Sequence, residues 1–279
     1  MKPTIIVGYD VETASESTVG FLEGAAALHT RLGIPWAIYV TGETFEKHAD
    51  MIAGMASDPL LTVGQHTYSH VLLKTIYMTP QDGRPVHGSY PSFIKVGASL
   101  DKIREELGRT QALIEDTLAT RCRGLTGPWG YYRGLADRPD ILAIIEEYGL
   151  CWIRTNAREC RDCQPTPFTE QPFFYRDQGF PEILELGIHG YQDDFYWERF
   201  DNRRYGDTYL DYLIGKLDEV LSAGQVWSFC SHDHGTPSKA VFDKTRGMWL
   251  KRFFDRAIEL GFRFVGPGQL YKELQAGSG

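Results

Sequence analysis

The feature that most constrains the fold is a regular alternation of short apolar runs and amphipathic segments. The runs Thr4–Tyr9, Trp36–Val40 and Leu60–Val63 are nearly continuous apolar stretches, as expected of strands buried on both faces. Apolar residues at helical spacing follow the first two runs, over residues 20–32 and 43–55. This order of strand, helix and strand predicts a parallel α/β sheet or barrel.

The same alternation continues to the end of the chain. Helices are expected over residues 99–118, 138–148, 209–223 and 249–260, and strands over 150–153, 183–189, 226–231 and 262–265. About seven strands therefore alternate with helices, and no internal repeat interrupts them. A length of 279 residues suits a single domain over residues 1–279, because α/β barrels of this size fold as one unit.

Composition excludes several classes of function. The net charge of −8 argues against a nucleic-acid partner. No apolar run approaches the ~20 residues of a membrane span, and the first residues do not resemble a signal peptide. Five cysteines, an odd number, favour a reducing compartment, so we expect a cytoplasmic protein. Cys160 and Cys163 are expected to be a thiol pair on a surface loop, and a homo-oligomer stays open.

Polar side chains follow two of the early strands where each strand ends. Asp10 and Glu12 come directly after the first strand, and His66 and His70 come after the third. In parallel α/β folds this end of the sheet carries the active site. If a helix begins near His66, the two imidazoles lie on one helical face and can reach one metal ion. The alternatives are a helix cap at Asp10 and surface histidines, so a metal site needs further residues.

Two later strand ends also carry candidate residues. The run at residues 226–231 ends at His232-Asp233-His234. The turn Gly127-Pro128-Trp129 has the glycine and proline of a rigid turn that lets a ligand approach the backbone. Trp129 is either a wall for a sugar or another flat ligand, or part of a buried aromatic cluster.

Two segments are expected to face the substrate. Residues 73–96 contain several prolines and glycines with aromatic residues between them, and a loop of this length inside a compact domain is usually functional. Residues 190–197 hold Asp193 and Asp194 beside three aromatic residues, which favours a substrate-facing loop. The segment 154–180 is expected to be a further loop.

Taken in order, these motifs resemble the polysaccharide deacetylases, the NodB-type domain of carbohydrate esterase family 4. The resemblance rests on the acidic turn at Asp10, the run His66-Thr67-Tyr68-Ser69-His70, the proline–aromatic turn and the late histidine, and it covers residues 4–270. Asp10-x-Glu12 and Gly127-Pro128-Trp129 look like its intracellular branch. That branch includes peptidoglycan-deacetylase-like proteins, lipid-linked formamido-arabinose deformylases, and cofactor-independent allantoinases and cyclic imidases.

The resemblance implies a distorted (β/α) barrel of about seven parallel strands and a divalent metal held by one carboxylate and two histidines. It implies that Glu12, His66 and His70 bind the metal, that Asp10 is the general base and that His232 is the general acid. Zinc is the expected metal, with Co²⁺, Mn²⁺ and Ni²⁺ as alternatives. The residues expected to contact the substrate are Pro128, Trp129, Asp193, Asp194 and Trp197.

The chain departs from the family pattern in three places. Glu12 stands where the family has a metal-binding aspartate. Thr126-Gly127-Pro128 replaces the usual Arg-x-Pro turn, whose arginine positions the base, and Arg123 and Arg133 are the candidates to replace that arginine. His234 competes with His232 for the role of the acid.

The chemistry of these residue types suits amide hydrolysis. Zinc bound by two histidines and one carboxylate keeps an open position, lowers the pKa of water toward ~7 and polarises a carbonyl. A free carboxylate then accepts the proton of water, and a histidine protonates the leaving nitrogen. We therefore expect a metal-dependent deacetylase or deformylase that acts on an N-acylated sugar or saccharide. The alternatives are a cyclic amide or imide hydrolase and a non-catalytic binding protein on the same barrel.

Overall fold

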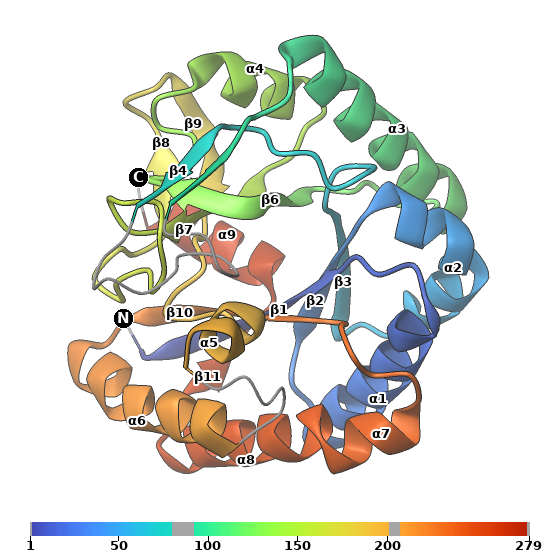
Figure 1. Ribbon diagram of the computed structural model, residues 1–279, viewed down its shortest axis with the longest axis vertical. Helices are drawn as coiled ribbons and strands as arrows, with labels where there is room; N and C mark the ends of the chain where they lie inside the picture. The colour runs from blue at the N-terminus through green and yellow to red at the C-terminus, as the bar shows by residue number, and fades with distance from the viewer. Residues whose placement is uncertain (1, 80–91, 201–206, 278–279) are drawn as a thin grey trace.

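The computed structural model describes residues 2–79, 92–200 and 207–277, and its centre is a curved, mostly parallel sheet (Figure 1). The spatial order of its parallel strands is β10 (Val226–His232), β1 (Thr4–Val11), β2 (Trp36–Val40), β3 (Leu61–Gln65), β6 (Gly124–Tyr132), β7 (Trp152–Arg158) and β9 (Phe180–Glu185). A short strand, β8 (Phe173–Tyr175), runs antiparallel to β9, and β11 (Arg263–Phe264) pairs with the start of β1. The expected parallel α/β architecture is confirmed.

The outermost parallel strands of this sheet, β9 and β10, meet through loop residues rather than through a strand pair. The backbone N–H of His189, just after β9, donates to the carbonyl of Ser228 at 3.0 Å. The side chain of Gln171 bonds both the N–H and the carbonyl of Val226. These contacts bridge the gap between the two strands, so the sheet forms a distorted barrel.

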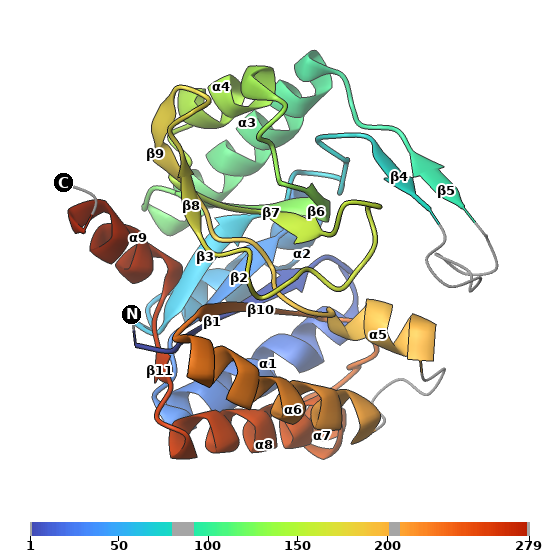
Figure 2. The ribbon, with the colours of Figure 1, turned by 90° about the vertical axis from the view of Figure 1, so that its left-hand side faces the viewer.

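Helices surround the barrel on the outside (Figures 1 and 2). They are α1 (Glu16–Leu32), α2 (Gly42–Met55), α3 (Leu100–Leu118), α4 (Pro139–Glu147), α5 (Asp193–Phe200), α6 (Asp207–Ala223), α7 (Lys239–Lys244), α8 (Arg246–Glu259) and α9 (Pro267–Ala276). Ser99 caps α3 as expected, because its hydroxyl accepts from the N–H of Lys102. Among the described residues, no helix has the length and apolar character needed to cross a membrane.

Strand β1 shows how the barrel interior is layered, because alternate side chains of a strand point to opposite faces. Ile5, Val7 and Tyr9 belong to the main core beneath the helices. On the other face, Ile6 joins a smaller apolar cluster with residues of α9 that closes one end of the barrel. Gly8 and Asp10 follow on this interior face, so the barrel becomes polar toward the carboxyl ends of its strands.

Four local predictions were wrong. Residues 66–70 form no helix but a loop, in which Thr67 (φ 61°) and His70 (φ 58°) are left-handed. Strand β7 continues through residues 154–158, which were expected to be a loop. Helix α5 occupies most of the expected loop at 190–197. The expected loop at 73–96 contains an antiparallel pair, β4 (Ile76–Met78) and β5 (Phe93–Lys95), and its residues 80–91 lie outside the described part of the chain.

Candidate functional site

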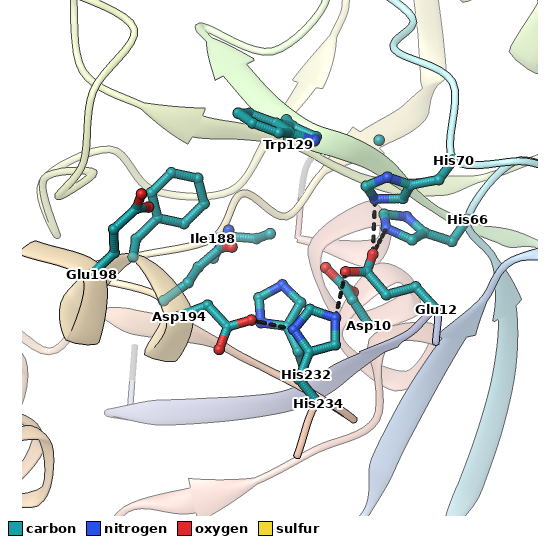
Figure 3. Close-up of a pocket in the computed structure, with 14 residues that line it drawn as sticks. Asp10, Glu12, His66, His70, Trp129, Ile188, Asp194, Glu198, His232 and His234 are labelled. Carbon is teal, nitrogen blue, oxygen red and sulfur yellow. Dashed lines mark hydrogen bonds and ion pairs between the residues drawn. The ribbon is translucent and has the colours of Figure 1, made fainter. Parts of the chain in front are cut away.

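A pocket of about 210 Å³ opens at the carboxyl ends of the barrel strands (Figure 3). It is lined by Asp10, Glu12, His66, His70, Gly127, Trp129, Gly130, Ile188, Gln192, Asp194, Phe195, Glu198, His232 and His234. The structure therefore brings together the candidate residues of β1, β3 and β10, although β1 and β10 lie at opposite ends of the chain. The rule that such residues meet at one edge of a parallel sheet accounts for this convergence.

Glu12, His66 and His70 form a compact group on one side of this pocket. Oε2 of Glu12 lies 2.8 Å from Nε2 of His70 and 3.3 Å from Nε2 of His66, and one donor atom from each residue lies within 4.8 Å of the others. Nδ1 of His66 donates to the carbonyl of Thr126 at 2.8 Å. This bond fixes the ring so that the Nε2 lone pair faces the pocket, as a metal-binding histidine requires.

The loop that carries these histidines is held in an uncommon conformation. Left-handed φ angles at non-glycine residues cost about 1–2 kcal/mol each, and neighbouring contacts offset that cost. The Thr67 hydroxyl accepts from the N–H of Val71 at 3.1 Å. Glu106 of α3 is buried and accepts from the N–H and the hydroxyl of Ser69. The two tight bends turn His70 back beside His66, and their ring centroids lie 4.7 Å apart.

The donor set of this group fits a divalent transition metal. Two imidazole nitrogens and one carboxylate are the ligands of open catalytic zinc sites. Burial alone would raise the pKa of Glu12, but its contacts with His234, His66 and His70 hold that pKa well below its usual value. The carboxylate is therefore ionised, which is the form that binds a metal.

Asp10 lies beside this group and is fixed by an arginine that the sequence did not indicate. The carboxylate is buried, and its Oδ1 accepts from Nη1 of Arg154 at 3.1 Å. Nη1 of Arg154 also donates to the hydroxyl of Thr126 at 3.2 Å, and Nη2 donates to the carbonyl of Phe229. On the other side, the Cys230 thiol lies 3.3 Å from Oδ2 of Asp10.

Gly8 makes room for Arg154 inside the barrel. A Cβ atom at position 8 would lie 2.5 Å from Nη1 and 2.7 Å from Cζ of Arg154, so a larger residue would displace the guanidinium. Neither arginine named from the sequence contacts Asp10: Arg123 bonds the sulfur of Cys151, and Arg133 is exposed. The signal for Arg154 was its place directly after the apolar run 150–153, which predicts an inward-facing cation if the strand continues.

The two late histidines are each anchored by an aspartate of helix α5. Nδ1 of His232 lies 2.6 Å from Oδ1 of Asp193, and Nδ1 of His234 makes a short bond with Oδ2 of Asp194. Asp193 is also fixed by Arg246, whose Nη1 lies 2.6 Å from its Oδ2. Nε2 of His234 reaches Oε1 of Glu12 at 2.9 Å.

These aspartates determine the protonation of both histidines. Burial alone would lower the pKa of His232, but the charge of Asp193 and its hydrogen bond raise it to about 9. Burial opposes protonation of His234 too, and its bonds to Asp194 and Glu12 raise its pKa to about 11. Both imidazoles are therefore protonated on both ring nitrogens, and so positively charged, at neutral pH.

The expected substrate-contacting residues divide into two groups. Trp129 and Asp194 line the pocket, whereas Pro128 does not. Asp193 and Trp197 are buried, and Trp197 packs against Tyr209 and Trp249 instead. Asp193 and Trp197 therefore lie behind the pocket wall, and their contact with a substrate stays a prediction.

Helical periodicity explains why Asp193 and Trp197 do not line the pocket. Asp193 and Trp197 are four residues apart and share the inner face of α5, and Asp194 and Glu198 share the face toward the pocket. Phe195 also lines the pocket and was not singled out from the sequence. Reading residues 193–200 as a helix would have separated the two faces.

Trp129 forms one wall of the pocket because its backbone is held in a left-handed conformation (φ 68°). Nε of the buried Arg158 donates to the carbonyls of Trp129 and Gly130, each at 2.9 Å. Phe93 stacks on the indole at 5.7 Å, and Nζ of Lys95 lies 4.1 Å from the ring centroid. The described part of the 73–96 segment therefore supports the pocket wall.

Cys160 and Cys163 were expected to lie together on a surface loop, and the structure confirms this for only one of them. Cys160 is exposed, but Cys163 is buried, with its sulfur 3.3 Å from the carbonyl of Thr79. The two cysteines are not an exposed pair, and they lie outside the pocket.

Comparisons with known proteins agree with the fold and the motifs. The family model described as polysaccharide deacetylase matches residues 8–150. A comparison with curated protein sequences finds no match. A putative polysaccharide deacetylase from Mycobacterium smegmatis has a similar structure, with 16% identity, a TM-score of 0.67 and coverage of 99% of this chain and 91% of that one.

Two further structures extend the comparison. The Puue allantoinase has 12% identity and a TM-score of 0.69, over 99% of this chain and 91% of that one. A pseudoenzyme of carbohydrate esterase family 4 from Bacillus anthracis has 14% identity and a TM-score of 0.56, over 97% of this chain and 66% of that one. At these identities the structural similarity shows a shared fold.

Proposed function

Because the chain belongs to the polysaccharide deacetylase family, we propose that it is a metal-dependent amidohydrolase that removes an acetyl or formyl group from an N-acylated sugar or saccharide. One observation carries the proposal: Glu12, His66 and His70 converge in the same pocket as a fixed carboxylate, Asp10, and an aspartate-anchored histidine, His232.

Glu12, His66 and His70 would hold the metal. Zinc suits this donor set, and when bound such an ion polarises the acyl carbonyl and makes water acidic near neutral pH. The loop conformation around His70 and the bond from His66 to Thr126 orient the two imidazoles before any ion binds.

Asp10 is the proposed general base. Arg154 fixes its carboxylate from the barrel interior, and Asp10 also lines the pocket, so a water molecule there can transfer a proton to it. A base held in one position contributes about 10²–10⁴ in rate. Arg154 thus supplies the positioning that the family assigns to the arginine of its Arg-x-Pro turn.

His232 is the proposed general acid. Asp193 holds its Nδ1, which leaves the protonated Nε2 directed toward the pocket. The proton on Nε2 passes to the leaving nitrogen as the C–N bond breaks. Asp193 stabilises the charged imidazole before that transfer, as carboxylates paired with catalytic histidines do.

The pocket suits a small group at the reactive end of the substrate. Its volume of about 210 Å³ is below the ~300–1,000 Å³ of drug-sized ligand sites. Trp129 and Phe195 offer apolar surfaces on which a sugar ring can stack. The same size favours a second candidate, a small cyclic amide or imide, and the similarity to an allantoinase structure supports testing it.

The test starts from protein purified without chelators. Metal content is measured first, followed by acetate and formate release from N-acetyl and N-formyl sugars and oligosaccharides, with a cyclic ureide and a cyclic imide as the other arm. We expect Asp10→Asn to keep its metal and lose about 10²–10⁴ in kcat, and Glu12→Gln to bind metal more weakly. Arg123→Gln is the matched control, because this arginine does not touch the site.

Each contrary result has a definite meaning. If Asp10→Asn empties the site and Glu12→Gln leaves it full, the two carboxylate roles are inverted. If metal-loaded protein hydrolyses none of these compounds, the catalytic proposal fails, and a binding protein on the same barrel becomes the better explanation.

A further inference from the structure

The two oxygens of the Glu12 carboxylate have different partners. Oε2 faces the metal-binding nitrogens of His66 and His70, at 3.3 and 2.8 Å. Oε1 points the other way and lies 2.9 Å from Nε2 of His234 (Figure 3). His234 in turn is held at Nδ1 by Asp194 of helix α5. A continuous row, Asp194–His234–Glu12, thus links α5 to the metal-binding group.

We infer that His234 is a positioning residue that holds the Glu12 carboxylate in place for the metal, through Oε1 and with support from Asp194. The inference rests on the proposed metal site. His234 is not a ligand in it, because the compact donor group is formed by Glu12, His66 and His70.

The length of Glu12 explains why such a residue is needed. Glutamate has one more rotatable bond than the aspartate usual at this position, so a free carboxylate samples more positions and loses more rotamer entropy when it is fixed. A donor on Oε1 removes that freedom and leaves Oε2 as the oxygen presented to the metal. Carboxylate ligands are commonly hydrogen-bonded in this way by residues that do not touch the metal.

The neighbouring His232 provides an internal comparison. The rings of His232 and His234 are nearly parallel, with centroids 5.4 Å apart, and each is anchored by an adjacent aspartate of α5. Of these two rings, only that of His234 forms an ion pair with Glu12 within the described residues. Because Nε2 of His234 is committed to that contact, the inference also leaves His232 as the proton donor.

The experiment measures the zinc dissociation constant, by competition with a chromophoric chelator, on metal-free protein titrated with Zn²⁺ alone. We expect His234→Ala to bind zinc about 10–100-fold more weakly than the wild type. His234→Gln keeps a side-chain N–H donor and should recover part of that loss. Asp194→Asn should have a smaller effect in the same direction. His232→Ala is the matched control and should stay within about threefold, because Asp193 holds its Nδ1 at hydrogen-bond distance and the ion pair with Glu12 belongs to His234.

A double variant tests the mechanism itself. Glu12→Asp shortens the side chain so that His234 no longer reaches it. In the Glu12→Asp background, His234→Ala should therefore have no further effect on zinc affinity. Thermal unfolding of each metal-free variant shows that the differences come from folded protein.

The outcomes separate this inference from the proposed function. Wild-type zinc affinity in His234→Ala, or an equal loss in His232→Ala, would overturn the inference and leave the metal site standing. The inference would also be overturned if His234→Ala weakened zinc binding equally in the wild-type and the Glu12→Asp backgrounds. A wild type that binds no zinc would refute both.

Discussion

The pocket holds two pairs of histidines that the protein treats differently. His66 and His70, after β3, share the Glu12 carboxylate. Burial lowers the pKa of His70, whereas for His66 burial is outweighed by the charge of Asp10 and the bond to Glu12, which raise the pKa. His232 and His234, at the end of β10, are each held at Nδ1 by an aspartate of α5, and the negative charges around them, Glu12 included, outweigh burial and raise their pKa values to about 9 and 11. We propose that the first pair offers lone pairs to a metal and that the second carries protons. On this proposal, the carboxylates beside a histidine decide whether it acts as a metal ligand or as a general acid.

The largest effect should come from removing the first pair. We expect the double variant His66→Ala/His70→Ala to lose stoichiometric zinc, because two of three ligands disappear. His232→Ala should retain its metal and lose activity, by more than His234→Ala does. Metal analysis after gel filtration measures the first effect and kcat the second. Full metal retention in the double variant would show that His66 and His70 are not the metal ligands.

The next largest effect should come from breaking the buried ion pair between Arg154 and Asp10, and it concerns the free energy of unfolding. Arg154→Met leaves Asp10 buried without its cation, and loss of one partner of such a pair costs about 3–5 kcal/mol. Urea unfolding of metal-free protein gives the free energy, and Arg123→Gln should change it by less than about 0.5 kcal/mol. Asp10→Asn/Arg154→Met should be more stable than Arg154→Met alone. Additive losses would show that the two side chains are not coupled.

The third prediction concerns the pH dependence of activity. A general acid must be protonated, so activity falls as the pH rises through the pKa of His232. The Asp193 carboxylate raises that pKa, and Asp193→Asn should therefore move the alkaline limb of the kcat/KM profile to lower pH. Asp194→Asn is the matched comparison and should move this limb less. An unmoved limb in Asp193→Asn would reassign the acid.

The last prediction concerns a buried histidine outside the pocket, His29. His29 is fully buried between Tyr9 and the carbonyl of Ile34, and burial lowers its pKa from 6.5 to about 3. Between these values the unfolded chain binds the extra proton, so the free energy of unfolding falls as the pH falls, by about 1.4 kcal/mol per pH unit. His29→Gln lacks this contribution, so the difference in the free energy of unfolding between the wild type and the variant should change by about 1.4 kcal/mol per pH unit in this range. Parallel curves over the range between the two pKa values would contradict it.

Much of the fold was predictable because the strands are short, apolar and regularly spaced. The rule that polar residues gather at strand ends also placed Asp10, Glu12, His66 and His232 at one edge of the sheet. A helix after β3 was not a safe prediction, because Glu106, far away in sequence, holds the loop at Ser69. Arg154 was missed because an arginine inside a barrel is stable only with partners from other strands, which local sequence does not reveal.

The glycine at position 8 limits which side chains the barrel interior can hold beside Asp10. With Arg154 filling the space beside it, the interior holds one guanidinium next to Asp10. Thr126, the position of the family's usual arginine, already bonds Arg154, so a second guanidinium there would compete for the same space and the same carboxylate. The two arrangements exclude one another, and exchanging them takes coordinated changes on separate strands. Gly8, Thr126 and Arg154 therefore form one unit across three strands, in which a change at any one position disturbs the other two.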